Sequence, residues 1–330
     1  MRRALLIPVL AIAAPVVVLL LAIVFGGPAR PAAMASINEP FKAVDMSGLP
    51  PLRTFRGADN LELGYREYVV PGAVGSVTLV HGSSADSASM HPLAMALAAA
   101  GYSVYTLDMR GHGGSGSRGH IGFIGQLESD LEAFVGAVRP QAPATLAGFS
   151  SGGGFVLRFA ASERQALFDS YLLLAPFLGQ DAPSHRPDSG GWVSVGVPRI
   201  IALSLLNGLG ISSLNHLPVT RFALDDSARE ILTPEYDFNL AMNFRPESNY
   251  LASIQRVRRP CAVLAGDADE AFRAEQYQPI VRRAGRDWSV RLLPGVGHIG
   301  LLLSPVALDA VVNQVRELQA AAHAADSGSK

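Results

Sequence analysis

One serine in this sequence has the surroundings expected of a nucleophile. Ser150 stands in the run Gly148-Phe149-Ser150-Ser151-Gly152, between a short apolar segment and an expected helix. This G-x-S-x-G pattern predicts a tight strand-to-helix turn, in which glycine is needed because two backbone segments crowd each other. Such a turn holds the serine oxygen above the sheet, and the first amides of the helix point toward a reacting carbonyl. We therefore expect a nucleophile at Ser150 rather than a plain glycine-rich turn.

A serine hydroxyl needs a neighbouring base, and the base needs an acid that orients it. His298 is the expected base because it follows the last expected strand, as the chain order serine, acid, histidine requires. The acid should follow the preceding strand, where Gly266-Asp267-Ala268-Asp269 offers two carboxylates. We prefer Asp269 as the acid and expect Asp267 to hold the turn. The other histidines are expected to have structural roles, in loops for His81 and His112 and in the surface or core for His91, His120, His185, His216 and His323.

Two backbone amides are expected to form an oxyanion hole, the site that stabilises negative charge on the carbonyl oxygen during the reaction. One is the amide of Ser151, the residue after the nucleophile. The other should come from the loop after the expected strand Val77–Val80. Ser83 is the preferred donor in that loop, because Gly82 permits the backbone to turn there, and Ser84 is the alternative.

A second glycine-rich segment raises the question of a cofactor. Gly111-His112-Gly113-Gly114-Ser115-Gly116 fits G-x-G-x-x-G, the pattern of a dinucleotide-binding turn. That turn belongs at the start of its domain, with an acid at the end of the next strand. The acids at the right distance, Glu128, Asp130 and Glu132, lie on an expected helix instead. We therefore expect neither a dinucleotide nor any other cofactor.

Composition excludes several other classes of protein. The 330 residues are 49% hydrophobic and 17% charged, whereas a disordered chain has the opposite balance. Lys and Arg number 27 against 28 Asp and Glu, so no basic excess is available to bind nucleic acid. The single cysteine, Cys261, excludes a disulfide within the chain and a cysteine-rich zinc site, and no metal is expected.

The segments that must position these side chains alternate between expected strands and helices. This alternation predicts an α/β fold with a mostly parallel sheet and helices on both faces, formed by residues 53–175 and 257–322. Residues 176–256 contain no obvious strand and are too many for an ordinary connection, so we expect a helical cap there. The expected strands are Val77–Val80, Tyr102–Leu107, Thr145–Ala147, Tyr171–Leu174, Cys261–Leu264 and Val290–Leu293.

The N-terminal segment, residues 1–26, has the composition of a membrane anchor. After Arg2 and Arg3, the run Ala4–Phe25 carries no charge, and its roughly 22 residues would form a helix of about 33 Å. The arginines predict a cytoplasmic N-terminus, with the rest of this single-pass protein outside the cytoplasm. The alternative is a signal peptide cleaved near Ala35, followed by secretion. Residues 27–52 are expected to be a linker and 323–330 a disordered tail.

Together these motifs resemble the α/β-hydrolase superfamily, and within it the monoacylglycerol lipase and lysophospholipase group of serine aminopeptidase S33-like hydrolases. The resemblance covers roughly residues 53–320 and implies a catalytic triad of Ser150, Asp269 and His298 below a cap that covers an acyl pocket. One departure is Glu270-Ala271-Phe272 after the acid, where relatives often have a small apolar turn. The matching motifs are His81-Gly82, Asp108-Met109-Arg110-Gly111-His112-Gly113-x-Ser115, Gly148-x-Ser150-x-Gly152, Gly266-x-x-Asp269 and Gly297-His298.

The resemblance implies a serine hydrolase that cleaves carboxylic esters. The apolar cap runs Trp192–Pro198 and Ile200–Leu206 favour single-chain acyl lipids, such as monoacylglycerols or lysophospholipids, as substrates of a membrane-tethered enzyme. Two alternatives stay open: an aminopeptidase, which needs cap carboxylates to bind an ammonium group, and a non-catalytic tethered binding protein. No obligate protein partner is expected. The candidate carboxylates are Asp225, Asp226, Glu230, Glu235 and Asp237.

Overall fold

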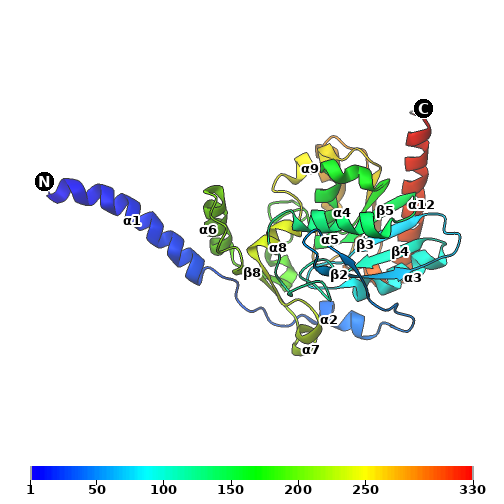
Figure 1. The fold of residues 1–330 in the computed structure, drawn as a ribbon, viewed down its shortest axis with the longest axis horizontal. Helices are drawn as coiled ribbons and strands as arrows, with labels where there is room; N and C mark the ends of the chain where they lie inside the picture. Colours follow the sequence, from blue (N-terminus) through cyan, green and yellow to red (C-terminus); the bar gives the residue numbers. More distant parts are fainter. Residues whose placement is uncertain (1, 329–330) are drawn as a thin grey trace.

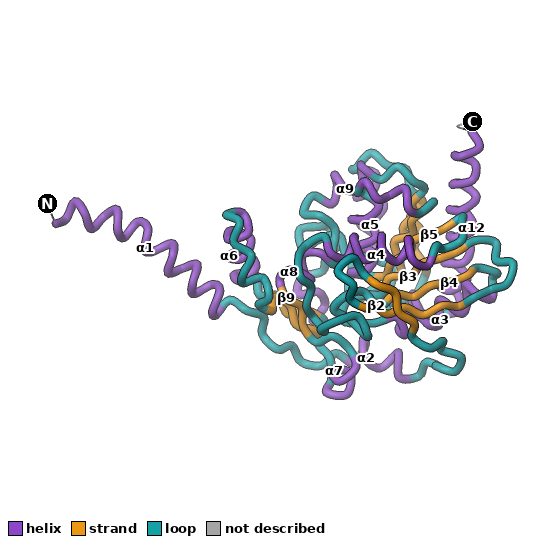
Figure 2. The backbone as a smooth tube through the Cα atoms, in the orientation of Figure 1, coloured by secondary structure: helices purple, strands orange, loops and turns teal. Residues whose placement is uncertain are grey.

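The fold is built on one large sheet (Figures 1 and 2). A computed structural model describes the backbone of residues 2–328, and it describes side chains outside 1–13, 35–38, 188–189 and 326–330. Eight strands lie in the order β1-β2-β4-β3-β5-β6-β10-β11, and all neighbours are parallel except for β2, which is antiparallel to β1 and β4. The strands are β1 (Arg53–Arg56), β2 (Glu62–Tyr68), β3 (Ser76–Val80), β4 (Ser103–Leu107), β5 (Ala144–Phe149), β6 (Ser170–Leu174), β10 (Cys261–Gly266) and β11 (Ser289–Leu293).

The central strands are buried along their whole length, which explains their apolar sequences. Every residue of β3, β4, β5, β6 and β10 is buried, as expected when helices cover both faces of a parallel sheet. Helices α3 (His91–Ala99), α11 (Gly300–Leu303) and α12 (Pro305–Gly328) pack together on one face. The other face is covered by α4 (Gln126–Val138), α5 (Ser151–Ala160), α9 (Tyr250–Arg256) and α10 (Tyr277–Arg283). The mostly parallel sheet and its two helical layers confirm the expected α/β architecture.

Helix α12 corrects one expectation about the C-terminus. It continues through Gly328, so the segment expected to be a disordered tail from His323 is helical to that residue. Buried side chains of α12 extend to Ala322, against the sheet face, and the helix carries on beyond its last packed turn. Small polar residues near a chain end therefore did not stop the helix.

The cap corrects a second expectation, because it contains a sheet as well as helices. Three short antiparallel strands, β7 (Val193–Val195), β8 (Pro218–Phe222) and β9 (Glu235–Asp237), are combined with α6 (Val197–Gly208), α7 (Asp226–Ile231) and α8 (Phe238–Asn243). The strands have three to five residues and most of these are only half-buried. Such short, weakly patterned segments give little of the alternation by which a strand is recognised.

The N-terminal region forms two helices, α1 (Arg2–Phe25) and α2 (Ala35–Lys42), the second of which lies inside the expected linker. Helix α1 projects away from the sheet, beside α6 of the cap (Figure 1). The guanidinium of Arg199 on α6 donates to the carbonyls of Ile23 at 2.8 Å and Val24 at 3.1 Å, at the end of α1. Within the part of the chain whose side chains the structure describes, which in α1 is residues 14–25, no helix has the length and apolarity needed to cross a membrane.

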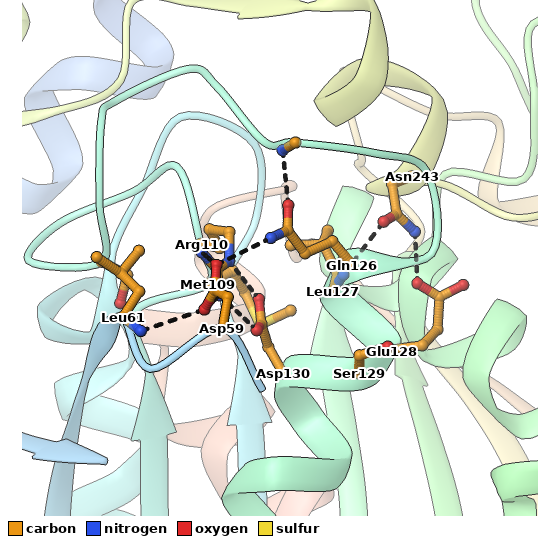
Figure 3. Close-up of polar contacts among 12 residues, drawn as sticks. Asp59, Leu61, Met109, Arg110, Gln126, Leu127, Glu128, Ser129, Asp130 and Asn243 are labelled. Carbon is orange, nitrogen blue, oxygen red and sulfur yellow. Dashed lines mark hydrogen bonds and ion pairs between the residues drawn. The ribbon is translucent and has the colours of Figure 1, made fainter. Parts of the chain in front are cut away.

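A buried ion pair fixes the loop that follows β4 (Figure 3). The guanidinium of Arg110 donates to both carboxylate oxygens of Asp130 on α4, at 2.7 Å each, and to both oxygens of Asp59 at 2.8 and 2.9 Å. Arg110 and Asp130 are each 6% exposed.

The same view shows Asn243 of the cap helix α8, whose side-chain oxygen accepts from the Leu127 amide and whose NH₂ donates to Glu128. These contacts attach the cap to α4.

We predict that Arg110→Ala lowers the free energy of unfolding by about 3–5 kcal/mol, because it leaves the buried Asp130 carboxylate without its partner. The matched control is Arg164→Ala, which breaks the exposed Arg164–Glu132 pair on the same face and should cost less than about 1 kcal/mol. Urea denaturation of both variants measures the difference. Equal losses would contradict the assignment of this pair as a structural anchor.

Candidate active site

Ser150 occupies the sharp turn that its glycine neighbours predict. It lies between β5 and α5 with φ +56° and ψ −120°, a region that non-glycine residues rarely adopt. A Cβ at Gly148 would lie 2.4 Å from the carbonyl oxygen of Gly152, and one at Gly152 would lie 2.2 Å from that of His81. No side chain fits at these distances, so both glycines are required by the close approach of the backbone.

The structure brings Ser150, His298 and Asp269 into one hydrogen-bonded chain. Nε2 of His298 lies 3.1 Å from Oγ of Ser150, and Nδ1 lies 2.8 Å from a carboxylate oxygen of Asp269. The second oxygen of Asp269 accepts from the amides of Ala271 and Phe272, both at 2.8 Å. A carboxylate facing Nδ1 keeps the imidazole proton on that nitrogen, so Nε2 is free to accept the serine proton. All three side chains are buried.

The residues next to the acid hold the loops together. Asp267 is exposed, and its carboxylate accepts from the amide of Gly295 at 2.7 Å, so it holds the turn after β11 and not, as expected, its own turn. Glu270, noted in the sequence only as a departure from relatives, accepts the amide of His298 itself at 2.9 Å. This contact links the acid loop to the histidine loop, and no local motif points to it.

Ser83 and Ser151, whose amides are the expected oxyanion donors, line one cavity together with Ser150. Ser151 begins α5 and Ser83 lies on the loop after β3, and their hydroxyl groups are 2.5 Å apart. Among the residues that the structure describes, neither backbone amide has an acceptor. Ser84, the alternative donor, is occupied: its amide donates to the hydroxyl of Tyr236 at 2.6 Å, and its φ is +70°.

Tyr236 was not found from the sequence, although it shapes this loop from the cap. It lies on β9, and its hydroxyl, which accepts from Ser84, donates in turn to Nε2 of His112 at 2.6 Å. Nδ1 of His112 faces the carbonyls of Met109 and Arg110 and therefore carries the ring proton. Burial, together with the neighbouring His81, holds the pKa of His112 well below its usual range, so the ring stays neutral.

The other motif residues have structural roles. Nε2 of His81 accepts the amide of Met109 at 3.2 Å, and burial lowers the pKa of this ring. Asp108 accepts the amides of Ser87 and Gly114, at 2.8 and 2.7 Å. The glycine-rich segment is therefore a turn closed on the Asp108 carboxylate. Among the described residues, no group of three or more His, Cys, Asp or Glu side chains could hold a metal ion.

Two cavities meet at Ser150. The larger has a volume of about 350 Å³, and its walls come from α2, α7, α11 and the loop after β3. The smaller, of about 90 Å³, lies under the cap sheet and α8. Ser150, Ser83, Trp192 and His298 line both. The apolar walls of the larger cavity are formed by Phe41, Met46, Phe149, Leu224, Ile231, Leu232, Ile299 and Leu302.

Comparison with known proteins identifies the family. The model of the family described as serine aminopeptidase, S33, matches residues 72–302, which include all three members of the hydrogen-bonded chain. The protein belongs to this family. The serine aminopeptidase S33 family is the one whose motifs the sequence resembles, and the match confirms that resemblance.

The individual relatives of this S33 family member either match only part of the chain or share little sequence identity with it. It is 37% identical over 91 residues to the monoacylglycerol lipase of Mycolicibacterium smegmatis, and this stretch spans only 32% of that relative and 26% of this chain. Its structure is similar to that of a soluble variant of monoglyceride lipase from Saccharomyces cerevisiae, solved with a substrate analogue, with TM-score 0.63, 20% identity and coverage of 84% of this chain and 97% of that one. A membrane phospholipase A, described as a bacterial virulence factor, gives TM-score 0.57 and 18% identity over 98% of this chain and 99% of that one. These likenesses confirm the α/β-hydrolase fold.

We predict that Tyr236→Phe lowers the free energy of unfolding by about 1–3 kcal/mol, because the buried Ser84 amide and His112 ring lose their shared partner. Tyr105→Phe is the matched control, since the Tyr105 hydroxyl has no hydrogen-bond partner among the described residues and its loss should cost little. Thermal or urea unfolding compares the two variants. A loss no greater in Tyr236→Phe than in Tyr105→Phe would show that this hydroxyl does not hold the loop.

Proposed function

We propose that this protein is a serine hydrolase that cleaves carboxylic esters through an acyl-enzyme at Ser150. The observation that carries the proposal is the Ser150–His298–Asp269 chain, with two cavities that meet at Ser150 and two nearby amides that have no acceptor among the described residues. Ser150 attacks the ester carbonyl while His298 takes its proton, and Asp269 stabilises the imidazolium that forms. The amides of Ser83 and Ser151 bind the oxyanion. His298 then protonates the leaving alcohol, and water, activated by the same histidine, releases the acid.

Single-chain acyl lipids are the proposed substrates. The larger cavity falls within the volume range of ligand sites, about 300–1,000 Å³, and its walls are mostly apolar. It offers space for one acyl chain ending at Ser150, while the smaller cavity receives the alcohol part of the ester. The names of two similar proteins, a monoacylglycerol lipase and a monoglyceride lipase, favour the same substrate class.

A chain-length series tests this proposal. We expect kcat/KM to rise several-fold for each added pair of carbons across the C2, C8 and C12 p-nitrophenyl esters, measured below their critical micelle concentrations. The reason is that each buried CH₂ contributes about 0.8 kcal/mol to binding in the transition state. Ser150→Ala supplies the background rate. A flat or falling series would contradict the acyl-lipid assignment and leave only small esters as substrates.

An aminopeptidase activity is less well supported by the same cavities. An aminoacyl substrate would need a carboxylate in the site to bind its ammonium group. None of the five candidate cap acids lines either cavity, and Glu235 and Asp237 lie next to Arg221 and His120 instead. Asp86, on the loop after β3, does line the larger cavity, but its carboxylate accepts the amide of Ala88 at 3.0 Å, and burial raises its pKa, which disfavours the charged form that an ammonium group needs. Ester hydrolysis is therefore the proposed activity, in preference to aminopeptidase activity or to binding without catalysis.

We further propose that α1 tethers the enzyme to a membrane, with residues beyond it outside the cytoplasm. The uncharged run Ala4–Phe25 after Arg2 and Arg3 supports this, since a helix of 24 residues extends about 36 Å. Helix α6, which contacts α1, supports it as well. Four apolar side chains at every fourth position of the α6 segment are 47–77% exposed, a stripe suited to lipid. They are Val197, Ile201, Leu205 and Leu209.

The orientation can be tested in cells. We predict that protease added to intact spheroplasts digests the hydrolase domain and that the protein stays with the membrane fraction. A cytoplasmic marker protein, protected until lysis, is the control. Protection of the hydrolase domain until lysis would contradict the orientation, and release of a chain beginning near Ser36 into the medium would favour the cleaved signal instead.

A further inference from the structure

The guanidinium of Arg245 lies at the smaller cavity beside Ser150. Arg245 follows Phe244, just after α8, and lines this cavity together with Ser150 and His298. It is partly buried, and no carboxylate of the described residues lies within 4 Å of it. Burial lowers the pKa of Arg245; Asp181 is the acid close enough to oppose this shift, and Arg158 adds to it.

Other enclosed arginines of this protein have acceptors. Arg110 has two carboxylates, Arg158 has Glu128, and Arg186 donates to the carbonyls of Phe272 and Asp269. Among the described residues, none accepts a hydrogen bond from Arg245, whose contact is with the ring of Phe177, 6.0 Å from the guanidinium carbon. A guanidinium carries five N–H donors, and enclosing it without acceptors costs free energy. Because the Arg245 guanidinium lies at a proposed reaction site and has no acceptor among the described residues, we expect a ligand to bind it.

We propose that Arg245 is a specificity-determining residue that binds a phosphate group on the leaving alcohol of the substrate. The inference rests on the proposed function and names the kind of ester: a single acyl chain joined to an alcohol that carries a phosphodiester. The planar guanidinium donates two parallel hydrogen bonds to phosphate oxygens. The acyl chain occupies the larger cavity, so the ester carbonyl lies at Ser150 and the phosphate lies under the cap.

The reaction follows from this placement. Ser150 Oγ forms a bond to the carbonyl carbon, the bond from that carbon to the alcohol oxygen breaks, and His298 passes the serine proton to the leaving alcohol. The phosphate keeps its charge throughout, and Arg245 takes no part in proton transfer. Water then hydrolyses the acyl-enzyme and returns the proton to Ser150. Arg245 therefore acts on substrate choice, through binding.

The experiment compares two esters of one acyl chain, 1-lauroyl-lysophosphatidylglycerol and 1-monolauroylglycerol, each at the same mole fraction in micelles of one nonionic detergent that also hold the full-length protein. We expect wild type to prefer the phosphate ester. Arg245→Gln should lower the ratio of kcat/KM, phosphate over neutral, by roughly ten- to a hundredfold, as loss of a charged hydrogen bond does. Arg245→Lys should recover part of the ratio, because it keeps the charge and loses the two-pronged geometry. Arg164→Gln, which removes an exposed cation away from both cavities, should leave the ratio unchanged.

Circular dichroism and thermal unfolding of each variant establish that it is folded. An equal fall on both esters, or an unchanged ratio, would overturn the role of Arg245. If Arg245→Gln raised the inhibition constant of free laurate and left the ratio of kcat/KM unchanged, the guanidinium would bind the carboxylate product. That result would also overturn the proposed phosphate-binding role of Arg245. Failure of the proposed function has a different signature: wild type would be inactive on both lauroyl esters and on p-nitrophenyl octanoate.

Discussion

The close approach of three backbone segments around Ser150 is the constraint on which the site depends. Gly152 brings the first turn of α5 against the carbonyl of His81, at the start of the loop that carries Ser83. The same contact that bends the chain into the turn therefore sets the distance between the two candidate oxyanion amides. A side chain at Gly148 or Gly152 would force β5, α5 and that loop apart. Since a positive φ at Ser150 is itself unfavourable, the buried parallel strands on either side must hold the turn in place.

The cap also helps to fix the loop beside Ser150. Tyr236 ties Ser84 and His112 to the cap sheet, and Asn243 ties the cap to α4. The loop beside Ser150 is thus fixed by the core on one side and by the cap on the other. The larger cavity also depends on segments far apart in the chain, since Phe41 of α2 and Ile231 of α7 both line it. A displacement of the cap would therefore change the shape of the larger cavity and the position of the Ser83 amide together.

Short sequence motifs predicted those parts of the site whose geometry depends on residues close together in the sequence. The turn at Ser150, the position of His298 after the last strand and the choice of Asp269 over Asp267 follow from short motifs at strand ends, where the backbone geometry leaves few choices. Strands β3 to β6 were recognised because burial on both faces makes them continuously apolar.

The features that were not predicted depend on contacts between residues distant in sequence. Tyr236 meets Ser84 across 152 positions, and no spacing in the sequence marks it. Arg245 is distinguished because none of the described residues accepts a hydrogen bond from it, and this can be known only from the folded structure. The cap strands are half-buried and too short to show alternation. Helix α12 continues past its last packed side chains because alanine, the residue with the highest helix propensity, fills most of positions 320–325.

The central claim is that Ser150 is a nucleophile activated by His298. The most direct measurement is mass spectrometry of the full-length protein after reaction with a fluorophosphonate, followed by peptide mapping of the adduct. The account predicts one phosphonyl group per chain, located on Ser150, and no labelling in Ser150→Ala, with much slower labelling in His298→Ala. An unlabelled wild type, or an adduct on another residue that persists in Ser150→Ala, would contradict it.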